Sequence, residues 1–260
     1  MQTLLITGGS SGIGKATTSL FAERGWRVFE LSRHGESGEN ITHIDCDVRS
    51  VESVQQAVAE VLSRTDCVDV VISNAGFGIS GAVEFSAMEE IERQMDVNFL
   101  GAVRITQAIL PQLRQQRSGR IIYTSSVAAI LSVPYQSFYS ASKAAINAMA
   151  LALQNEVRDF GISVSVMMPG DVSTGFTDAR QKSAAGAEVY RGAEKAITTM
   201  ERDERGGMSP DEMAKLFYHI ATCHSPRPQY IGGFSYRVLC FLDRLLPKRL
   251  VNWIEYKVYS

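Results

Sequence analysis

Cysteine and histidine are scarce in this sequence, and neither is clustered. The 260 residues include four cysteines and four histidines, and no two cysteines are spaced as Cys-x-x-Cys. His219 and His224 are five residues apart, which alone is too little for a structural zinc site with its roughly four ligands. We therefore expect no metal site. We interpret the cysteines as small apolar core residues with free thiols, which favours a reducing intracellular compartment.

The sequence also has little net charge and no long uncharged apolar segment. A formal net charge of −2 gives no electrostatic reason to expect a nucleic-acid partner. No uncharged apolar run approaches the ~18 residues of a membrane span. The apolar run after Met1 is too short for a signal peptide and leads directly into glycines. These features predict a cytoplasmic protein.

Strand-like and helix-like segments alternate along most of the chain. Short apolar runs predict strands at 3–7, 27–31, 41–45, 68–73, 120–125 and 162–168, and a last strand within 228–233. Amphipathic segments predict helices at 12–24, 50–63, 86–116 and 137–159, the third bent near Gly101. Repeated β–α–β units with continuously apolar strands predict an α/β fold. We expect one Rossmann-like domain over residues 1–260, a doubly wound parallel sheet with helices on both faces.

Residues 173–207 interrupt this alternation. The segment is rich in small and charged residues and contains five glycines. An irregular insert of this length in a compact domain is often a substrate loop or lid. A solvated helical excursion is the alternative, and the sequence leaves both open.

A glycine-rich turn follows the first predicted strand and opens the first predicted helix. Residues 7–14 read TGGSSGIG, with glycines at positions 8, 12 and 14. Without Cβ atoms, backbone N–H groups can approach a pyrophosphate at the positive end of a helix. This placement favours a dinucleotide site, although an ordinary tight turn would produce a similar pattern.

The end of the second predicted strand bears on which dinucleotide is bound. An acidic residue at this point would bind the ribose 2′-hydroxyl of NAD. Here the chain has Ser32 and Arg33, whose hydroxyl and guanidinium suit a 2′-phosphate. Glu30 lies two residues short of the strand tip. We therefore expect NADP(H) rather than NAD(H), with an ordinary surface arginine as the alternative interpretation of Arg33.

Tyr139 and Lys143 are the candidate proton-transferring pair. They are four residues apart on the helix predicted at 137–159, so their side chains share a face. A free tyrosine has a pKa of about 10 and is a poor base at neutral pH. A neighbouring ammonium and an oxidised nicotinamide both favour the phenolate. On its own, however, the pair is common on helix surfaces.

Several further motifs, in matching order and spacing, make the chain resemble the short-chain dehydrogenase/reductase family over about residues 2–232. The shared elements are TGxxxGIG at 7–14, Asn74-Ala75-Gly76, Asn98 within DVNFLG, Ser126 thirteen residues before Tyr139, Tyr-x-x-x-Lys, and Pro169-Gly170 followed by Thr174. The resemblance implies a nicotinamide-dependent oxidoreductase on the fold predicted above.

The resemblance implies roles for four catalytic residues. Tyr139 would donate a proton to a carbonyl oxygen, or accept one from an alcohol, and Ser126 would hydrogen-bond the same oxygen. Lys143 would lower the tyrosine pKa and hold the nicotinamide ribose. Asn98 would anchor a water that relays protons to the lysine; an asparagine that kinks its helix is the structural alternative. Ser125 is the rival of Ser126, but the spacing to Tyr139 favours Ser126.

The resemblance also implies the cofactor contacts. Asp47 and Val48 match the family's adenine-contacting pair, and Thr174 is placed to contact the nicotinamide carboxamide or the phosphates. A tight strand-end turn would equally explain Asn74-Ala75-Gly76. The predicted contacts are Gly8, Ser10, Ser11, Gly12, Ile13, Gly14, Ser32, Arg33, Asp47, Val48, Asn74, Ala75, Gly76, Tyr139, Lys143, Pro169, Gly170, Val172 and Thr174.

Residues 234–260 continue well beyond the last predicted strand. They form an apolar helical pattern that Pro247 interrupts, with basic residues interspersed. Three interpretations stay open: a tail packed on the domain or on a partner subunit, a cover over an apolar substrate pocket, and an amphipathic element at a membrane surface. The tail and the long insert resemble the branch with 17β-hydroxysteroid and retinol dehydrogenases, which implies a lipophilic substrate.

The leading prediction is an NADP(H)-dependent enzyme that interconverts a lipophilic ketone or aldehyde and an alcohol. One alternative is an NAD-preferring dehydrogenase that uses Glu30 after a register shift. The other is a non-catalytic nucleotide-sensing protein on the same fold. Family resemblance also implies a homodimer or homotetramer, with the helices at 86–116 and 137–159 as subunit contacts.

Overall fold

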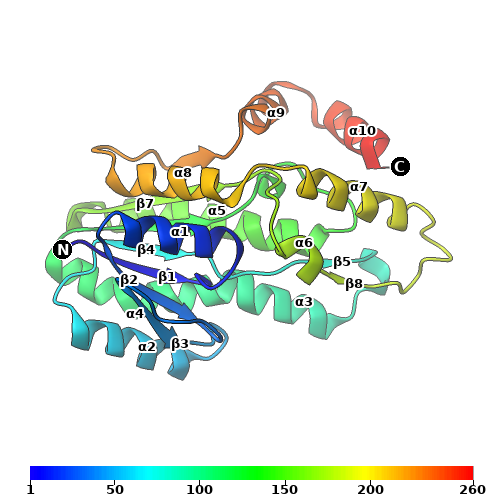
Figure 1. The fold of residues 1–260 in the computed structure, drawn as a ribbon. Coiled ribbons are helices and arrows are strands. Elements are labelled where there is room, and N and C mark those ends of the chain that lie inside the picture. The colour runs from blue at the N-terminus through cyan, green and yellow to red at the C-terminus, as the bar shows by residue number, and fades with distance from the viewer. Residues whose placement is uncertain (260) are drawn as a thin grey trace.

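The computed structural model describes residues 1–259 and contains a seven-stranded, wholly parallel sheet (Figure 1). The strand order is β3-β2-β1-β4-β6-β7-β9. The chain therefore winds outward from β1 in one direction and then, from β4, in the other, as a doubly wound sheet requires. The strands are β1 Thr3–Thr7, β2 Arg27–Ser32, β3 Ile41–Asp45, β4 Val70–Ser73, β6 Gly119–Thr124, β7 Ile162–Met168 and β9 Gln229–Ile231.

Helices cover both faces of this sheet, and the central strands β1 and β4 are buried on both sides. On one face, α1 (Gly12–Glu23) and α8 (Pro210–Thr222) enclose a core around Phe21 and Phe217. On the other, α2 (Val51–Arg64), α4 (Gly101–Gln116) and α5 (Ser137–Glu156) pack over the opposite side chains of the same strands. The predicted Rossmann-like fold is thus confirmed, with most element boundaries within three residues of those expected.

The long helical stretch is divided where a bend was expected. α3 (Met88–Met95) passes through a π-helical turn, Asp96–Leu100, into α4. A Cβ atom at Gly101 would lie 2.9 Å from Val48 Cγ2, so a larger residue there would push the helix away from the sheet. Asn98 lies within the π-helical turn and is buried, and π-helical turns are common at functional sites.

Helix α8 was not among the predicted helices, although its start carries a clear signal. Ser209 Oγ accepts a hydrogen bond from the Glu212 N–H, and the Glu212 carboxylate accepts one from the Ser209 N–H. Pro210 occupies the first helical position. This reciprocal pair is a capping box, a pattern readable from sequence alone.

The insert at 173–207 is folded and partly helical. It contains α6 (Phe176–Ala179), the short strand β8 (Gln181–Lys182), which pairs with β5 (Ile79–Ser80), and α7 (Ala193–Arg205). The buried Arg180 side chain forms an ion pair with Glu204, which ties α6 to α7. The expected helical excursion is present, and its function as a substrate lid stays a prediction.

The C-terminal extension forms two helices, as predicted. They are α9 (Phe234–Leu245) and α10 (Lys248–Tyr259), with Pro247 between them. Both lie outside the helical layers of the sheet, at the top of Figure 1. Three 3₁₀ turns complete the secondary structure of the described residues: Val83–Phe85, Val127–Ala129 and Arg158–Phe160.

Truncating Phe217 tests the packing of α8 on the sheet. Phe217 is fully buried, so Phe217→Ala should lower the free energy of unfolding by about 3–5 kcal/mol. Phe241→Ala is the matched control on α9, where the ring is 60% exposed, and should change stability by less than about 0.5 kcal/mol. Urea denaturation measures both. Equal effects of the two substitutions would contradict this assignment of the core.

Candidate active site

The carboxyl ends of four neighbouring strands open into one cavity of about 590 Å³. Strands β1, β4, β6 and β7 end at Thr7, Ser73, Thr124 and Met168, and they are adjacent in the sheet. The cavity lies where the strand order reverses, which is where open α/β sheets bind ligands. Its volume suits a small organic molecule.

The glycine loop forms one wall of this cavity. Gly8 and Gly12 have φ values of +65° and +51°, which a side chain would strain. A Cβ atom at Gly14 would lie only 2.0 Å from the Gly8 carbonyl oxygen. The first turn of α1 contains no acidic residue, and Ser11 makes no side-chain cap. The helix N-terminus is thus suited to an anionic group such as a pyrophosphate.

Asn74 holds the loop against the neighbouring strand ends. Its Nδ2 donates to the Gly8 carbonyl at 3.0 Å, and its Oδ1 accepts from Thr124 Oγ1 at 3.1 Å. Thr7 Oγ1 accepts from the N–H groups of Asn74 and Ala75 at 3.0 and 3.1 Å. The ends of β1, β4 and β6 are therefore tied together, so this motif has at least the structural role considered for it.

Tyr139, Ser126 and Lys143 converge on the cavity. The Lys143 Nζ atom lies 5.7 Å from the centroid of the Tyr139 ring. The pKa of Tyr139 is raised to about 12, chiefly by burial, while the Ser126 hydroxyl acts in the opposite direction through a hydrogen bond. The net direction is opposite to the lowering that family resemblance implies. That lowering stays a prediction for the protein with oxidised nicotinamide bound.

Lys143 is a buried ammonium whose position is fixed by carbonyl groups. Its Nζ donates to the Thr124 carbonyl at 2.9 Å. Burial lowers its pKa to about 8. Its own carbonyl accepts a hydrogen bond from Ser125 Oγ at 3.0 Å. The Ser125 hydroxyl is therefore occupied by a hydrogen bond to α5. Its neighbour Ser126 is the serine in contact with Tyr139.

Asn98 lies near Lys143, behind Gly76. Its carboxamide pairs with both backbone groups of Phe77 at 3.0 Å and donates to Ser142 Oγ at 3.1 Å. Its Oδ1 and Lys143 Nζ lie 3.2 and 3.4 Å from the point that a Cβ atom at Gly76 would occupy. Gly76 thus lets both approach the cavity, while the water relay through Asn98 stays a prediction.

Six of the predicted site residues lie outside the cavity lining. Glu30 is 3% exposed, and its carboxylate accepts from Ser32 Oγ at 3.1 Å and lies 2.6 Å from His43 Nδ1. Arg33, just beyond β2, is exposed. The predicted residues that do not line the cavity are Ser10, Ser32, Arg33, Asp47, Val48 and Asn98.

Asp47 and Val48 follow β3 and lie outside the cavity lining. Asp47 forms a salt bridge to Arg49 at 2.6 Å, which holds its pKa below the usual value. The side chain of Val48 is buried in the core against Gly101. Contact of this pair with adenine stays a prediction, and for Val48 its backbone is the part available.

The opposite wall of the cavity contains the predicted Pro169, Gly170, Val172 and Thr174. A Cβ atom at Gly12 would lie 3.5 Å from Thr174 Cβ, so the glycine loop and Thr174 face each other. The ring of Tyr236, from α9, occupies the space that Gly170 leaves free. The sequence analysis considered the tail as a cover over the pocket but did not include Tyr236, Leu239 or Tyr259, which line the cavity, among the site residues.

The cavity is also acidic, which sequence reasoning missed. Asp171, Asp203 and Glu204 line it. Burial raises the pKa of Asp171, although its carboxylate accepts a hydrogen bond from the Tyr236 hydroxyl. Glu204 and Asp171 both raise the pKa of Tyr139 further. These carboxylates come from two distant segments, so no local sequence pattern marks them as one group.

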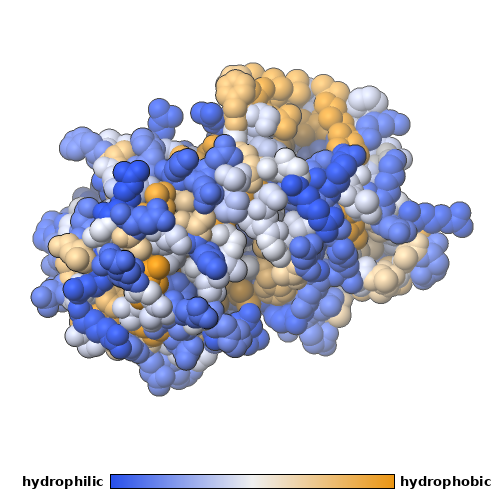
Figure 2. Space-filling view, in the orientation of Figure 1, coloured by the Kyte–Doolittle hydropathy of each residue, from blue (hydrophilic) through white to orange (hydrophobic). Residues whose placement is uncertain are grey.

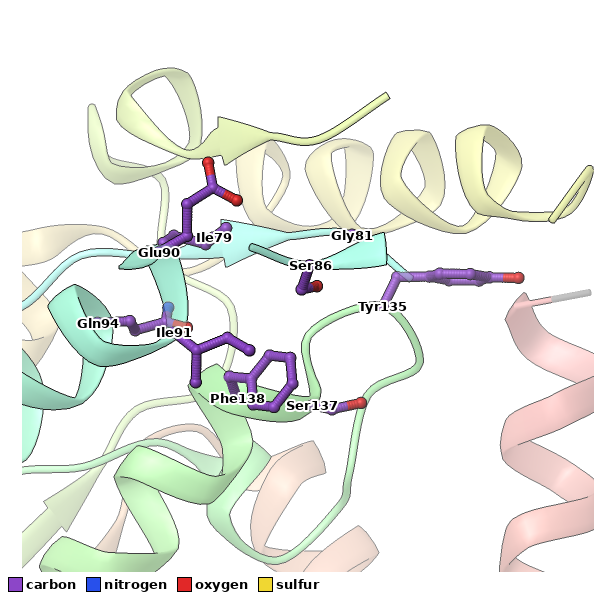
Figure 3. A pocket seen from close by; sticks show the side chains of 9 residues that line it. All are labelled: Ile79, Gly81, Ser86, Glu90, Ile91, Gln94, Tyr135, Ser137 and Phe138. Atoms are coloured by element: carbon purple, nitrogen blue, oxygen red, sulfur yellow. The ribbon is translucent and has the colours of Figure 1, made fainter. Parts of the chain in front are cut away.

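Six apolar residues of the segments around the cavity divide into three sets. Phe77, Val133 and Phe176 line the large cavity. Ile79 and Phe138 line a separate hollow of about 10 Å³, about one water in size, where Phe138 lies beside Ile91 (Figure 3). Met168 is buried in the core. Only the first set is therefore placed to contact a substrate.

Two features are absent from residues 1–259. Groups of three or more His, Cys, Asp or Glu side chains able to hold a metal ion are absent from this part of the chain. No helix within it is long and apolar enough to cross a membrane. The four cysteines are free thiols, with Cys46 and Cys240 buried.

Comparison with known proteins gives consistent matches. Residues 2–185 match the sequence model of the short chain dehydrogenases. The chain is 39% identical over 231 residues to the 3-ketodihydrosphingosine reductase of Bacteroides thetaiotaomicron, covering 86% of this chain and 85% of that protein. Its structure is similar to that of a short-chain dehydrogenase from Streptomyces avermitilis (27% identity, TM-score 0.83, 98% of this chain and 97% of that chain). It is also similar to an alcohol dehydrogenase from the archaeon Thermococcus sibiricus, complexed with 5-hydroxy-NADP (25% identity, TM-score 0.73, 89% and 95% covered).

Replacing Lys143 tests the cost of burying its charge. Below a pH of about 8 the ammonium is protonated in the folded as well as the unfolded chain, so folding at neutral pH buries a charge. Between about 8 and the ordinary value of 10.5 the unfolded chain binds more protons, and stability rises with pH. Lys143→Met should therefore raise the free energy of unfolding at pH 7 by roughly 1–3 kcal/mol and abolish that rise.

Urea denaturation at neutral and alkaline pH measures both effects. Lys215→Met is the control, because Lys215 is exposed on α8; it should leave the pH dependence unchanged. A Lys143→Met protein less stable than the wild type at pH 7 would show that the buried ammonium does not weaken the fold.

Proposed function

Because the chain belongs to the short-chain dehydrogenase family, within which it resembles the hydroxysteroid and retinol dehydrogenases, we propose that it interconverts a lipophilic ketone or aldehyde and the corresponding alcohol with NADP(H). The observation that carries the proposal is the convergence of Tyr139, Ser126 and Lys143 on the cavity beside the glycine loop. A non-catalytic nucleotide-sensing protein, the alternative from another class, would not require these groups to meet.

Tyr139 acts as the acid when a carbonyl group is reduced. Its pKa of about 12 keeps the phenol protonated at neutral pH, as a proton donor requires. Ser126 Oγ hydrogen-bonds the substrate oxygen and stabilises the charge that develops there. Lys143 holds the ribose of the nicotinamide, and its positive charge favours the phenolate left after proton transfer. When bound, the nicotinamide supplies or accepts the hydride.

The residues around the glycine loop fit a dinucleotide. A Cβ atom would fill the space at Gly8 and Gly14, and the N-terminus of α1 has no acidic neighbour in its first turn. The cofactor is proposed to contact Gly8, Ser10, Ser11, Gly12, Ile13, Gly14, Asn74, Ala75, Gly76, Pro169, Gly170, Val172 and Thr174 along the loop and the strand ends.

Preference for NADP(H) is supported by the state of Glu30. Its carboxylate lies beside His43 and accepts from Ser32, and it is almost fully buried. Both contacts are to Oε2, and Oε1 is buried, so a ribose 2′-hydroxyl could reach this carboxylate only after the side chain moved, which disfavours the NAD-binding alternative. Arg33 remains at the surface beyond the strand, where its guanidinium can pair with a 2′-phosphate.

A lipophilic substrate is supported by the cavity and by one relative. Apolar side chains extend from the reacting groups toward the tail: Phe77, Leu131, Val133, Phe176 and Leu239. The Bacteroides relative is named a 3-ketodihydrosphingosine reductase, and a long-chain ketone is therefore our first candidate. We further propose that the protein is cytoplasmic and works as a homodimer or homotetramer, as family members commonly do.

Tyr139→Phe tests the proton-transfer role. Removing the hydroxyl should lower kcat for reduction of a long-chain ketone by about 10²-fold or more. Binding of NADPH, followed by its fluorescence, should persist. Tyr218→Phe is the control, since Tyr218 packs against Phe21 and Trp26, away from the cavity. Full turnover by Tyr139→Phe would exclude the mechanism.

Arg33→Ala tests the cofactor preference. Loss of a guanidinium that pairs with a phosphate should weaken NADPH binding by roughly 10–100-fold, the equivalent of a charged hydrogen bond, and leave NADH binding unchanged. Fluorescence titration of the two cofactors measures this difference. Arg24→Ala, at the far end of α1, should alter neither. An equal loss for NADH and NADPH would show that Arg33 does not read the 2′-phosphate.

A further inference from the structure

The two C-terminal helices leave most of their apolar side chains exposed. Their inward stripe includes Tyr236 and Asp243 on α9 and Glu255 and Tyr259 on α10, all partly or fully buried. Burial and the nearby Asp243 raise the pKa of Glu255. A surface helix of a globular protein normally directs its apolar side inward. Among the apolar side chains of α9 and α10, only Cys240 and Val251 are buried, so most of the apolar side chains need another partner.

The outward face is apolar and exposed. Figure 2 shows apolar residues gathered over α9 and α10 at the top of the view. Phe234 is 75% exposed, Leu245 65% and Trp253 57%. Monomeric soluble proteins rarely expose a large contiguous apolar patch without a partner that covers it. The face consists of Phe234, Val238, Phe241, Leu242, Leu245, Leu250, Trp253, Ile254, Tyr256 and Val258.

The charge of these helices indicates what covers them. Residues 234–259 contain five basic and two acidic side chains, a net charge of +3, in a chain whose net charge is −2. One of the two acidic groups, Asp243, is buried and forms a salt bridge to Lys248 at 2.6 Å. Arg237, Arg244 and Lys257 are exposed beside the apolar residues. A partner with an apolar interior and an anionic surface complements this face.

Neither a spanning helix nor a second copy of the chain fits as well. Each helix has 12 residues, about 18 Å in length, which is shorter than a bilayer core of about 30 Å. The break at Pro247 prevents one continuous helix. A two-fold contact between copies would place the same positive face against itself, which is repulsive. Short helices with aromatic, basic and aliphatic residues instead suit the plane of a membrane surface.

We propose that the outer face of α9 and α10 binds the surface of an anionic lipid bilayer, and that the active-site cavity receives its substrate from that surface. The same two helices carry the outer face and form part of the cavity wall, because Tyr236, Leu239 and Tyr259 line the cavity. Leu239 lines the cavity, is 47% exposed, and is the chain neighbour of Val238 on the outer face. The binding of lipid stands apart from the catalytic assignment, whereas the delivery of substrate rests on the proposed function.

Vesicle binding by the full chain tests the first part. The protein should co-sediment with vesicles of phosphatidylcholine and phosphatidylglycerol at least tenfold more than with phosphatidylcholine alone, and salt should weaken the binding. The chain has two tryptophans, and Trp26 is buried. A blue shift of tryptophan emission on addition of vesicles therefore reports on Trp253.

Two matched double variants distinguish vesicle binding by this face from vesicle binding by exposed apolar side chains in general. Phe241→Ser with Leu245→Ser alters the proposed face, away from the cavity, and should weaken vesicle binding at least tenfold. Val83→Ser with Met88→Ser changes side chains of similar exposure elsewhere (56% and 59%) and should bind as the wild type does. Equal binding by both variants, or no binding of the wild type to anionic vesicles, would overturn the proposal. So would a dimer in sedimentation velocity that only the tail variant dissociates, since a second copy would then cover the face.

Activity measurements distinguish failure of this proposal from failure of the proposed function. The tail variant should reduce a short, water-soluble ketone as fast as the wild type but reduce a long-chain ketone in vesicles at least fivefold more slowly. A wild type that binds vesicles but turns over no carbonyl substrate would refute the enzyme assignment alone. Equal rates of both proteins on the ketone in vesicles would refute delivery from the membrane.

Discussion

The carboxamide of Asn74 makes the contact on which the rest of the site depends. It donates to the Gly8 carbonyl and accepts from Thr124 Oγ1, so it links the loop after β1 to the end of β6. The Thr124 carbonyl in turn accepts a hydrogen bond from the Lys143 ammonium. One chain of hydrogen bonds therefore extends from the glycine loop to the proposed proton-transfer group. The cofactor side and the reacting side of the cavity are held in register by the same strand ends.

Burial of the Lys143 ammonium costs free energy, and the stability of the sheet compensates for this cost. Lys143 is almost fully buried, and its nitrogen contacts a carbonyl rather than a carboxylate. Acidic side chains do line the cavity, yet Glu204 is paired with Arg180, and Asp171 accepts from Tyr236. The ammonium thus has no ionic partner among residues 1–259. An anion or an ordered hydroxyl in the cavity can therefore interact with its positive charge. Buried charges whose burial costs stability are common at catalytic sites.

Features set by local chemistry were predictable from the sequence. Strand runs, the glycine turn and the Tyr139–Lys143 spacing each depend on neighbours within a few residues, and the structure agrees with them. The family motifs also indicated which of two adjacent serines faces the tyrosine. Contacts between distant segments were not predictable in this way. The ring of Tyr236 over Gly170 joins residues far apart in the chain, and Val48 matched a family position although its side chain packs inward against Gly101.

The Tyr236 ring over Gly170 has a consequence for how such a protein can diversify. The groups proposed to carry out the chemistry sit at strand ends, where a change disturbs the sheet. Part of the cavity wall comes instead from α9 and α10. Few other elements of the domain pack against these two helices. Mutations in this terminal stretch can therefore alter which molecules are accepted while the reaction itself is inherited unchanged.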